Sequence, residues 1–428
     1  MRWTIGVAGL MIAAQAAAQQ PGDSLPTVTL DDAVQRALQV QPAMVTALGN
    51  QRNANASKLA AWGAFLPSVS VNGGATRSNR KRQDPNNFAN QLPPIYNYTT
   101  GLSANLNLFL GFRRIAGLQS ANASQDAAEA GFVNQRFQTA LSTKQAFFAA
   151  IANEELVKVA QAQTARTQQE LRVATDKLRA GAGTRSDSLT AAVDYGNAQV
   201  ALLQAQANLD GARATLGRQI GIDGSVRPVM DSVLPPLPDT AALRAAAVEN
   251  SPQVQQADAQ TRVAQAGVAV ARAQYLPTFS VSFNDGRTDT TFSGGFIHQE
   301  SFQWNFGVNF TLFNGFTREQ SQTSARVQRD IAAATALDTR RAVSAQMTQQ
   351  IASLGAAYSQ MTISQSSVAS ATEAYRVQTE RYRVGAAVIL DLLTAEANLI
   401  QAQVNLIQAR FTYLTTRAQL EALVGRAL

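Results

Sequence analysis

The chain has 428 residues, of which 46% are hydrophobic and only 15% charged, and its formal net charge is +7. The charged share is far below the ~25% that is usual in a soluble domain. With no cysteine and a single histidine, His298, the composition excludes disulfides, thiolate zinc sites, a cysteine nucleophile and any multi-histidine metal site.

Residues 1–18 are predicted to be a secretory signal peptide. Arg2 supplies a positive charge, Trp3 to Ala14 form a short apolar stretch, and small residues precede a cleavage site near Gln19. The apolar stretch is shorter than the ~20 residues that a transmembrane helix needs, and no run of that length follows it. We therefore expect an exported chain that can enter a membrane only as a β-barrel. The basic residues are scattered along helical segments, so no nucleic acid partner is expected.

An internal repeat organises the mature chain. FLPSVSVN at Phe65 returns as YLPTFSVSFN at Tyr275, and LFLGFRR at Leu108 returns as LFNGFTR at Leu312. Prolines cluster between the two copies and are absent from long stretches within them, which indicates a tandem duplication joined by a linker. The predicted parts are a first repeat at 19–227, a proline-rich linker at 228–238 and a second repeat at 239–428.

Each repeat is predicted to open with a helix and to continue with two strands. In the first repeat, Thr29 and Asp32 are the expected helix cap and Pro42 an interruption. The strands are expected at about 66–77, 98–110, 277–288 and 301–313. Apolar and polar residues alternate along them, which favours one face towards lipid and one towards a wet lumen, although a half-buried sheet in a soluble sandwich has the same pattern. The predicted lipid-facing residues are Val69, Val71, Leu102, Leu106, Leu108, Phe279, Val281, Trp304, Phe306 and Phe310.

Two very long helices are predicted to follow the strands, one in each repeat. Residues 113–180 and 316–384 contain no proline, and at 1.5 Å per residue each helix would reach ~100 Å. After a short break that contains glycine, each repeat turns back into a return helix, at about 187–220 and 391–424. The return helices carry heptads with one large and one small residue, which is typical of close coiled-coil packing.

The expected fold is an α+β membrane protein that is mainly α. Four strands cannot close a barrel, and open sheet edges are not tolerated in lipid. Two copies would give eight strands around an interior filled by side chains, whereas three copies would give twelve strands, wide enough to conduct. The sequence thus predicts an oligomer in which a β-pore continues into a long helical tube.

This order of elements resembles the TolC family of outer-membrane efflux and secretion channels, over about Thr27 to Leu428. The most family-like stretch begins with YRVGAAVILDLLTA at Tyr382 and runs to Gly425. The resemblance implies a homotrimer with a twelve-stranded barrel in the outer membrane of a Gram-negative bacterium and an α-helical tunnel in the periplasm. It further implies an exit duct for efflux or type I secretion. The implied partners are outer-membrane lipid, a periplasmic adaptor (membrane fusion protein) and an inner-membrane pump of RND, ABC or MFS type.

The resemblance places the periplasmic constriction at the start of the return helices. Asp391 matches an aspartate that lines the constriction in relatives, and Asp187 is its counterpart in the first repeat. Three copies would place three carboxylates at each level, which is a charge ring able to bind or select cations. An equally weighted alternative is that both aspartates only cap or charge helix N-termini.

Further gate residues follow from the same resemblance. Tyr382 matches a tyrosine in the network that holds the tip shut, and Ser186 matches a gate-side threonine. Two departures stand out, since Thr394 replaces a second aspartate and Ala387 an arginine that some relatives have. Arg185, on the other hairpin, is the candidate for the missing cation.

The helix turns are the expected contact with the adaptor. They comprise Gly181, Ala182 and Gly183 in the first repeat and Gly385 and Ala386 in the second. Taken alone, this composition is only a turn signal, because glycine permits positive φ.

No cofactor, metal site or enzymatic activity is predicted, because no convergent Ser–Lys or paired-carboxylate arrangement can be argued from spacing. Two other functions remain open. A stand-alone diffusion porin is disfavoured because it has no need of ~100 Å helices. A structural periplasmic coiled-coil protein or adhesin is disfavoured by the amphipathic strands.

Overall fold

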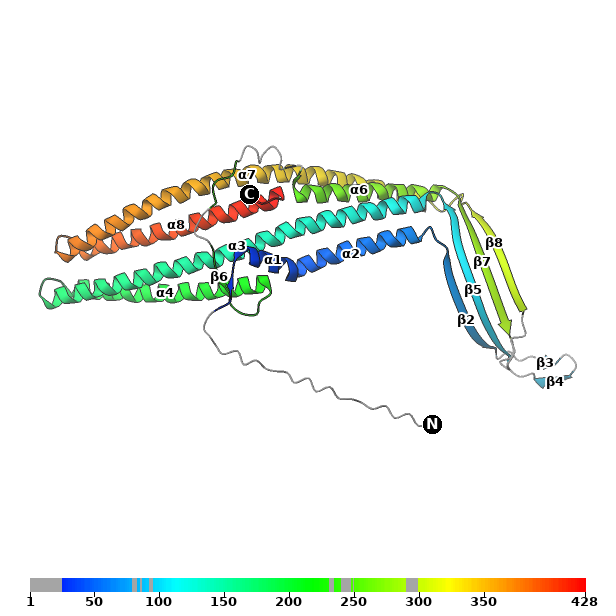
Figure 1. The fold of residues 1–428 in the computed structure, drawn as a ribbon, viewed down its shortest axis with the longest axis horizontal. Coiled ribbons are helices and arrows are strands. Elements are labelled where there is room, and N and C mark those ends of the chain that lie inside the picture. Colours follow the sequence, from blue (N-terminus) through cyan, green and yellow to red (C-terminus); the bar gives the residue numbers. More distant parts are fainter. Residues whose placement is uncertain are drawn as a thin grey trace.

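The computed structural model describes residues 25–78, 83–84, 87–91, 95–230, 235–239, 248, 250–289 and 299–428. The predicted signal peptide and His298 lie outside these residues, and so do parts of the linker. The molecule is elongated, with helices running side by side along most of its length and a β-sheet at one end (Figure 1).

Two helices of 67 residues form the long axis, α3 (Arg113–Arg179) and α7 (Thr317–Arg383). At 1.5 Å per residue each spans ~100 Å. Each turns back into a helix of 36 residues, α4 (Arg185–Ile220) after α3 and α8 (Ile389–Val424) after α7. Within the described part of the chain, no helix combines the length and the apolar character needed to cross a membrane.

Shorter helices complete each repeat on the side of the sheet. α2 (Pro42–Gly63) packs along α3, and α6 (Pro252–Arg272) packs along α7 and also along α3. A 3-10 turn at Ala273–Tyr275 follows α6. In Figure 1 the shorter helices follow one another end to end, α4 and α2 beside α3, and α8 and α6 beside α7. The duplication seen in the sequence is therefore a duplication of a long helix with two shorter companions.

The first helix begins and ends where the sequence predicts. The Thr29 hydroxyl accepts a hydrogen bond from the backbone N–H of Asp32 (3.3 Å), which caps α1 (Leu30–Val40). Gln41 adopts an extended conformation and Pro42 opens α2, because proline lacks the N–H that a continuous helix would use. The expected cap and the expected interruption are both confirmed.

The main hydrophobic core lies at mid-length, where the shorter helices meet. A short parallel pair, β1 (Thr27–Val28) with β6 (Arg227–Pro228), lies beside it and ties the N-terminal segment to the end of the first repeat. Side chains from both repeats fill this core, so it joins the two halves of the chain. Its largest fully buried members include Tyr413, Phe147, Leu216, Ile220, Met347, Leu354 and Leu420.

The sheet has four antiparallel strands in the order β2-β5-β7-β8. They are β2 (Ser68–Ser78), β5 (Ile95–Leu110), β7 (Thr278–Asp289) and β8 (Gln299–Asn309). A small hairpin, β3 (Gln83–Asp84) with β4 (Asn87–Gln91), lies between β2 and β5 in the chain. Among the described strands, β2 and β8 each have one neighbour, so the sheet has two free edges.

One face of the sheet is apolar, as the alternation predicts. Val71 lies opposite Leu102, and Phe306 lies opposite Val281, and paired residues share a face. Val71 and Phe306 are 81% and 78% exposed although both are strongly apolar. The sheet therefore presents apolar side chains outward without any described element covering them.

Two details of the predicted strands need correction. A β-bulge leaves Leu108 without a partner in β7, so Phe109 instead lies opposite Phe279, with the ring centres 5.9 Å apart. Phe310, expected within the last strand, lies beyond β8, which ends at Asn309 opposite Thr278. Pairing stops there because the next position of the partner strand is proline, which has no N–H to donate.

The turn between the sheet and each long helix has an unusual backbone. Both residues of the repeated Gly-Phe pair have positive φ, 58° and 65° at Gly111 and Phe112, and 67° and 64° at Gly315 and Phe316. For phenylalanine this conformation costs about 1–2 kcal/mol. At Gly111 a Cβ would lie 2.5 Å from the carbonyl oxygen of Ala273, so only glycine fits there.

Arg318 explains the last residue of the repeated LFxGFxR motif. Its guanidinium donates to the carbonyl oxygens of Thr311 (3.0 Å) and Leu312 (2.9 Å), beyond the end of β8. It also lies 4.9 Å from the centre of the Tyr275 ring. A single planar side chain thus fixes how the sheet joins α7.

Candidate functional site

The candidate site lies at the end of the molecule opposite the sheet, where α3 turns into α4 and α7 into α8 (Figure 1). Gly181 and Gly385 have φ of 75° and 83°. In the first turn the N–H of Ala182 donates to the Lys177 carbonyl (2.8 Å), and in the second that of Ala386 donates to the Arg381 carbonyl (2.8 Å). This 6→1 pattern is the Schellman motif, which ends a helix with a left-handed glycine.

The residues predicted to contact an adaptor all lie in these two turns. Gly181, Ala182, Gly385 and Ala386 are exposed, and Gly183 is partly buried against Lys177. The sequence reasoning missed an apolar component of the second tip, because it considered only the glycines and alanines. Val384, Val388 and Leu390 are all well exposed there.

Asp187 caps the helix that it helps to begin. Thr184 and Asp187 form a capping box, in which the Thr184 hydroxyl accepts from the Asp187 N–H (3.0 Å) and the Asp187 carboxylate from the Thr184 N–H (3.4 Å). Asp187 is half-buried. Its capping role is therefore present in the structure, whether or not it also lines a constriction.

Asp391 occupies the same position in α8 but has a different environment. The N-cap there is Val388, which has no hydroxyl, so no capping box forms. The Asp391 side chain is exposed in the first turn of the helix. It is thus the freer of the two carboxylates, and a negative charge at this position still interacts favourably with the helix N-terminus.

Tyr382 is the most buried of the predicted gate residues, at 5% exposed. The Lys177 ammonium lies 4.0 Å from the centre of its ring and also donates a hydrogen bond to its backbone carbonyl. Burial raises the pKa of the Tyr382 hydroxyl, and the negative charges of Asp187 and Glu170 add to this effect. The Lys177 ammonium also lies at the C-terminal end of α7, where the helix dipole favours positive charge.

Lys177 is a cation at the tip that the sequence analysis did not name, and the role expected of Arg185 stays a prediction. Arg185 and Ser186 are exposed in the first turn of α4, whereas the cation beside Tyr382 comes from the last turns of α3. The sequence reasoning searched for a replacement cation in the segment that aligns with the gate. Lys177 lies outside that segment, on the long helix of the first repeat.

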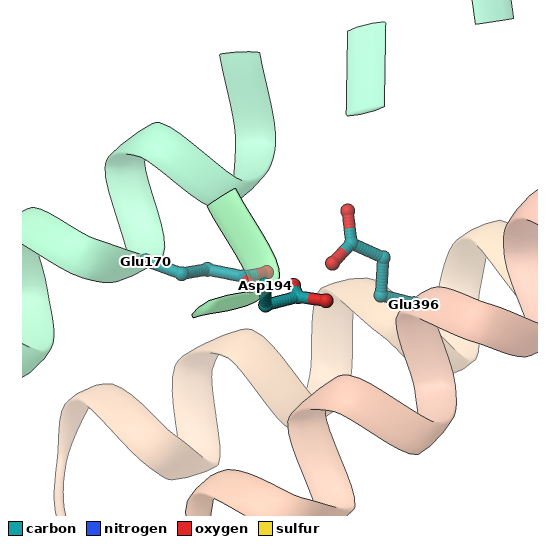
Figure 2. A group of neighbouring side chains, drawn as sticks. All are labelled: Glu170, Asp194 and Glu396. Carbon is teal, nitrogen blue, oxygen red and sulfur yellow. The ribbon is translucent and has the colours of Figure 1, made fainter. Parts of the chain in front are cut away.

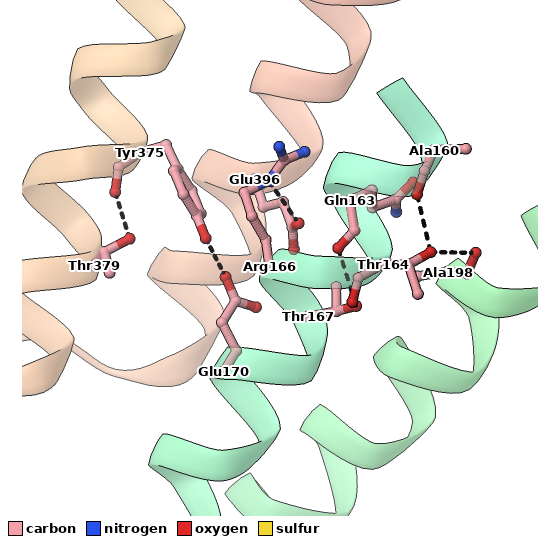
Figure 3. A network of polar contacts seen from close by, with 10 residues as sticks. All are labelled: Ala160, Gln163, Thr164, Arg166, Thr167, Glu170, Ala198, Tyr375, Thr379 and Glu396. Carbon is pink, nitrogen blue, oxygen red and sulfur yellow. Dashed lines mark hydrogen bonds and ion pairs between the residues drawn. The ribbon is translucent and has the colours of Figure 1, made fainter. Parts of the chain in front are cut away.

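A second contact joins the same helices two turns away from the Lys177–Tyr382 contact. The Tyr375 hydroxyl donates to the carboxylate of Glu170 (2.7 Å), as Figure 3 shows. Glu170 and Lys177 are seven residues apart on α3, and Tyr375 and Tyr382 are seven residues apart on α7. Two heptad-spaced rungs, Glu170–Tyr375 and Lys177–Tyr382, therefore connect α3 to α7.

Arg166 and Glu396 extend the Glu170–Tyr375 rung to α8. The Arg166 Nε donates to Glu396 (3.3 Å), and its guanidinium lies 5.7 Å from the centre of the Tyr375 ring (Figure 3). Burial raises the pKa of Glu170 and of Glu396, the latter to about 8, and the Glu170 charge further raises that of Glu396. Burial and the bond to Glu170 also raise the pKa of Tyr375. These residues were not predicted, because the partners are 205 or 230 residues apart in the chain and no motif links them.

Comparisons with known proteins agree with this architecture. A family profile described as "Outer membrane efflux protein" matches residues 33–221 and 243–426, which is one match to each repeat. The pyoverdine export outer membrane protein OpmQ of Pseudomonas aeruginosa is 26% identical over 386 residues, covering 86% of this chain and 78% of OpmQ.

Solved channels share the fold. The outer membrane protein VceC of Vibrio cholerae superposes with a TM-score of 0.78 at 19% identity, covering 93% of this chain and 96% of VceC. The CmeC outer membrane channel of Campylobacter jejuni gives 0.79 at 16% identity, covering 92% of this chain and 85% of CmeC.

The family match covers most of the chain, in two blocks that coincide with the repeats. Because the relatives are outer-membrane channels and not enzymes, the predicted efflux function, outer-membrane location and non-enzymatic nature are confirmed. The chain belongs to the outer membrane efflux protein family.

Proposed function

We propose that three copies of the chain form the exit duct of a tripartite efflux or type I secretion system. The supporting observation is the four-stranded sheet, which has an outward apolar face and two free edges. Because open edges are not tolerated in lipid, β8 of one copy must pair with β2 of the next. Three sheets then give a twelve-stranded barrel, wide enough to conduct.

The helices support the same assembly. Each copy contributes four helical stretches along its long axis, and three copies would enclose a tunnel about as long as α3 and α7. α4 carries exposed apolar residues on its outer surface, which would be covered by a neighbouring copy. They are Leu189, Val193, Val200 and Leu203.

The two rungs support a tip that is held closed in the assembly. They join α3 to α7 near the turns, so opening the tunnel end by moving one hairpin away from the other would break them. We place Asp391 at the constriction, with Asp187 capping the neighbouring helix and Tyr382 held by Lys177. Three copies would carry a ring of Asp391 carboxylates, which is suited to binding cations in the tunnel.

The partners in this proposal are a periplasmic adaptor and an inner-membrane pump of RND, ABC or MFS type. The tip surface supports an adaptor contact because it combines exposed apolar side chains with two glycine turns. Energy would come from the pump, since the helices and sheet of this chain contain no described nucleotide-binding loop.

Disulfide crosslinking tests the trimer, because the chain has no cysteine of its own. Cysteines introduced along β2 and β8, scanned around Ser70 and Asn305, should give a covalent trimer ladder on oxidation. The pair Ser70→Cys and Ser282→Cys is the matched control, since β5 lies between β2 and β7 and should keep these residues apart. A ladder from the control pair, or none from the edge pairs, would refute strand pairing between copies.

Two measurements test the gate and the adaptor contact. Asp391→Ala should reduce block of single-channel conductance by divalent cations in planar bilayers, and unchanged block would remove Asp391 from the constriction. Ala386→Cys should crosslink to the co-encoded adaptor, whereas Val327→Cys, exposed much nearer the sheet, should not.

A stand-alone diffusion porin is less well supported, because helices of 67 residues serve no purpose in simple diffusion. Deletion of the gene separates the two functions. Loss of export of a drug or secreted protein supports the exit duct, whereas loss of nutrient uptake alone supports the porin.

A further inference from the structure

Three carboxylates from three different helices meet about 14 Å from the tip, as estimated from the helical rise. They are Glu170 of α3, Asp194 of α4 and Glu396 of α8, and one oxygen of each lies within 4.8 Å of the others. Figure 2 shows the three side chains converging between the helices. This group is separate from the tip aspartates, which lie in the first turns of α4 and α8.

The group is buried and short of positive charge. Glu170 is 5% exposed and Glu396 is 2% exposed, while Asp194 is half-buried and provides the side open to solvent. Arg166 is the cation in contact with the group, through its 3.3 Å bond to Glu396. Three carboxyl groups face one guanidinium, so their ionised forms are costly in this buried environment unless a proton or a bound cation neutralises them.

An unsatisfied acceptor points into the same space. One oxygen of Glu170 accepts the Tyr375 hydroxyl, but the other, Oε2, is fully buried and receives no hydrogen bond. A carboxylate oxygen in this condition normally binds a donor or a metal ion. The Tyr375 hydroxyl and the Arg166 Nε already bond within the group, and the buried Arg166 Nη2 has no partner and does not bond to Oε2, so a bound cation is the ligand that Oε2 can take.

We propose that Glu170, Asp194 and Glu396 form a binding site for one divalent cation of the size of Ca²⁺. Hard cations bind carboxylate oxygens, and three carboxylates offer up to six, which suits the six to eight ligands of Ca²⁺. Ca–O distances of 2.3–2.6 Å allow oxygens on opposite sides of the ion to be about 5 Å apart, which matches the spacing here better than the shorter Mg–O distances. One divalent charge also brings the group with Arg166 to neutrality.

The site would act as a clamp between the two repeats. Glu170 and Asp194 belong to the first hairpin and Glu396 to the second, so a bound cation would bridge α3, α4 and α8. It would strengthen the region around the Glu170–Tyr375 rung.

Terbium luminescence on the full chain, purified in detergent, tests the proposal. Tb³⁺ substitutes for Ca²⁺, and the ring of Tyr375 is close enough to sensitise its emission, because its hydroxyl contacts a ligand. We expect one Tb³⁺ per chain, displaced by Ca²⁺, with calorimetry giving the Ca²⁺ affinity. Glu396→Gln and Asp194→Asn should each weaken binding at least roughly tenfold, consistent with losing a charged ligand.

Controls separate this site from other carboxylates. Asp210→Asn, an exposed change on α4, should leave binding unchanged, and circular dichroism should show every variant folded. Asp194→Asn provides a milder change if Glu396→Gln fails to fold. The proposal is overturned if wild type binds no Ca²⁺, which would mean that protons alone neutralise the group. Binding that survives both ligand variants but is lost in Asp391→Asn would also overturn it, because the cation would then be at the tip.

Discussion

The ammonium of Lys177 lies 4.0 Å from the centre of the Tyr382 ring and donates to the carbonyl of the same residue. Lys177 belongs to the first repeat and Tyr382 to the second, so this one side chain holds together the ends of two helices that are ~100 Å long. The contact combines a cation–π interaction with a hydrogen bond to a helix C-terminus, and both are lost if the hairpins separate.

Replacement of Lys177 by methionine should favour the open tip. The variant keeps the apolar stem but loses the charge, and a desolvated cation–π contact is worth about 1–2 kcal/mol. That corresponds to a shift of roughly 5–30-fold towards the open state. Single-channel recording should show a larger open fraction, and cells should become more sensitive to large antibiotics. Arg179→Met is the matched control, since Arg179 is exposed and contacts only Asp176 of its own helix among the ion pairs described. If Lys177→Met and Arg179→Met give the same open fraction, the Lys177–Tyr382 contact does not hold the tip closed.

Tyr375→Phe should destabilise the helical end of the molecule. It removes the donor to Glu170 and leaves a buried acceptor unsatisfied, which costs about 1–3 kcal/mol. Thermal unfolding followed by circular dichroism should show a lower midpoint. Tyr358→Phe is the control, because this partly exposed residue of the same helix keeps its ring contact with Tyr413 after the change. If the unfolding midpoint falls equally in Tyr375→Phe and Tyr358→Phe, the loss comes from removing any tyrosine hydroxyl of α7 and not from the bond to Glu170.

The two repeats offer a paired test of helix capping. Thr184→Val should remove the capping box of α4 and cost about 1 kcal/mol. Val388→Thr should create the same box with Asp391 in α8 and stabilise that helix by a similar amount. Hydrogen exchange of the first-turn amides should become faster in the first variant and slower in the second. If Val388→Thr does not slow exchange of the first-turn amides of α8, the Asp391 carboxylate is engaged elsewhere.

Arg318→Lys should weaken the junction between the sheet and α7. Lysine keeps the charge but cannot donate to two carbonyls at once or stack as a planar group on Tyr275. We expect a loss of about 1–2 kcal/mol, visible as a lower temperature for dissociation of the detergent-purified assembly. Arg329→Lys, a partly exposed residue paired with its sequence neighbour Asp330, should change nothing. If both variants dissociate at the wild-type temperature, Arg318 has no part in holding the junction.

Local patterns predicted the elements well because the physics behind them is local. Proline-free stretches with helical composition predicted α3 and α7, and the Thr29 cap and Pro42 break followed from hydrogen-bonding capacity alone. The strands followed from alternation, but their ends did not. The bulge at Leu108 and the early end of β8 depend on the partner strand, which alternation within one segment cannot reveal.

The site was harder to predict because its residues are far apart in the chain. Lys177 and Tyr382 are separated by 205 residues, and Arg166 and Glu396 by 230. Moreover, glutamates in an exported helical segment are expected on a solvated face, whereas Glu170 and Glu396 are buried. Only the packing of α8 on α3 brings them together, and no motif in the sequence announces it.

The equal lengths of the paired helices have a consequence for how this protein can change. α3 and α7 both have 67 residues and α4 and α8 both have 36, which keeps the two turns level and aligns Glu170 with Tyr375 and Lys177 with Tyr382. A seven-residue insertion in one arm would move a single turn by about 10 Å and pair the wrong rungs. A viable longer or shorter duct requires the same heptad to be added to or removed from all four arms together, so its reach across the periplasm can evolve only in whole, coordinated steps.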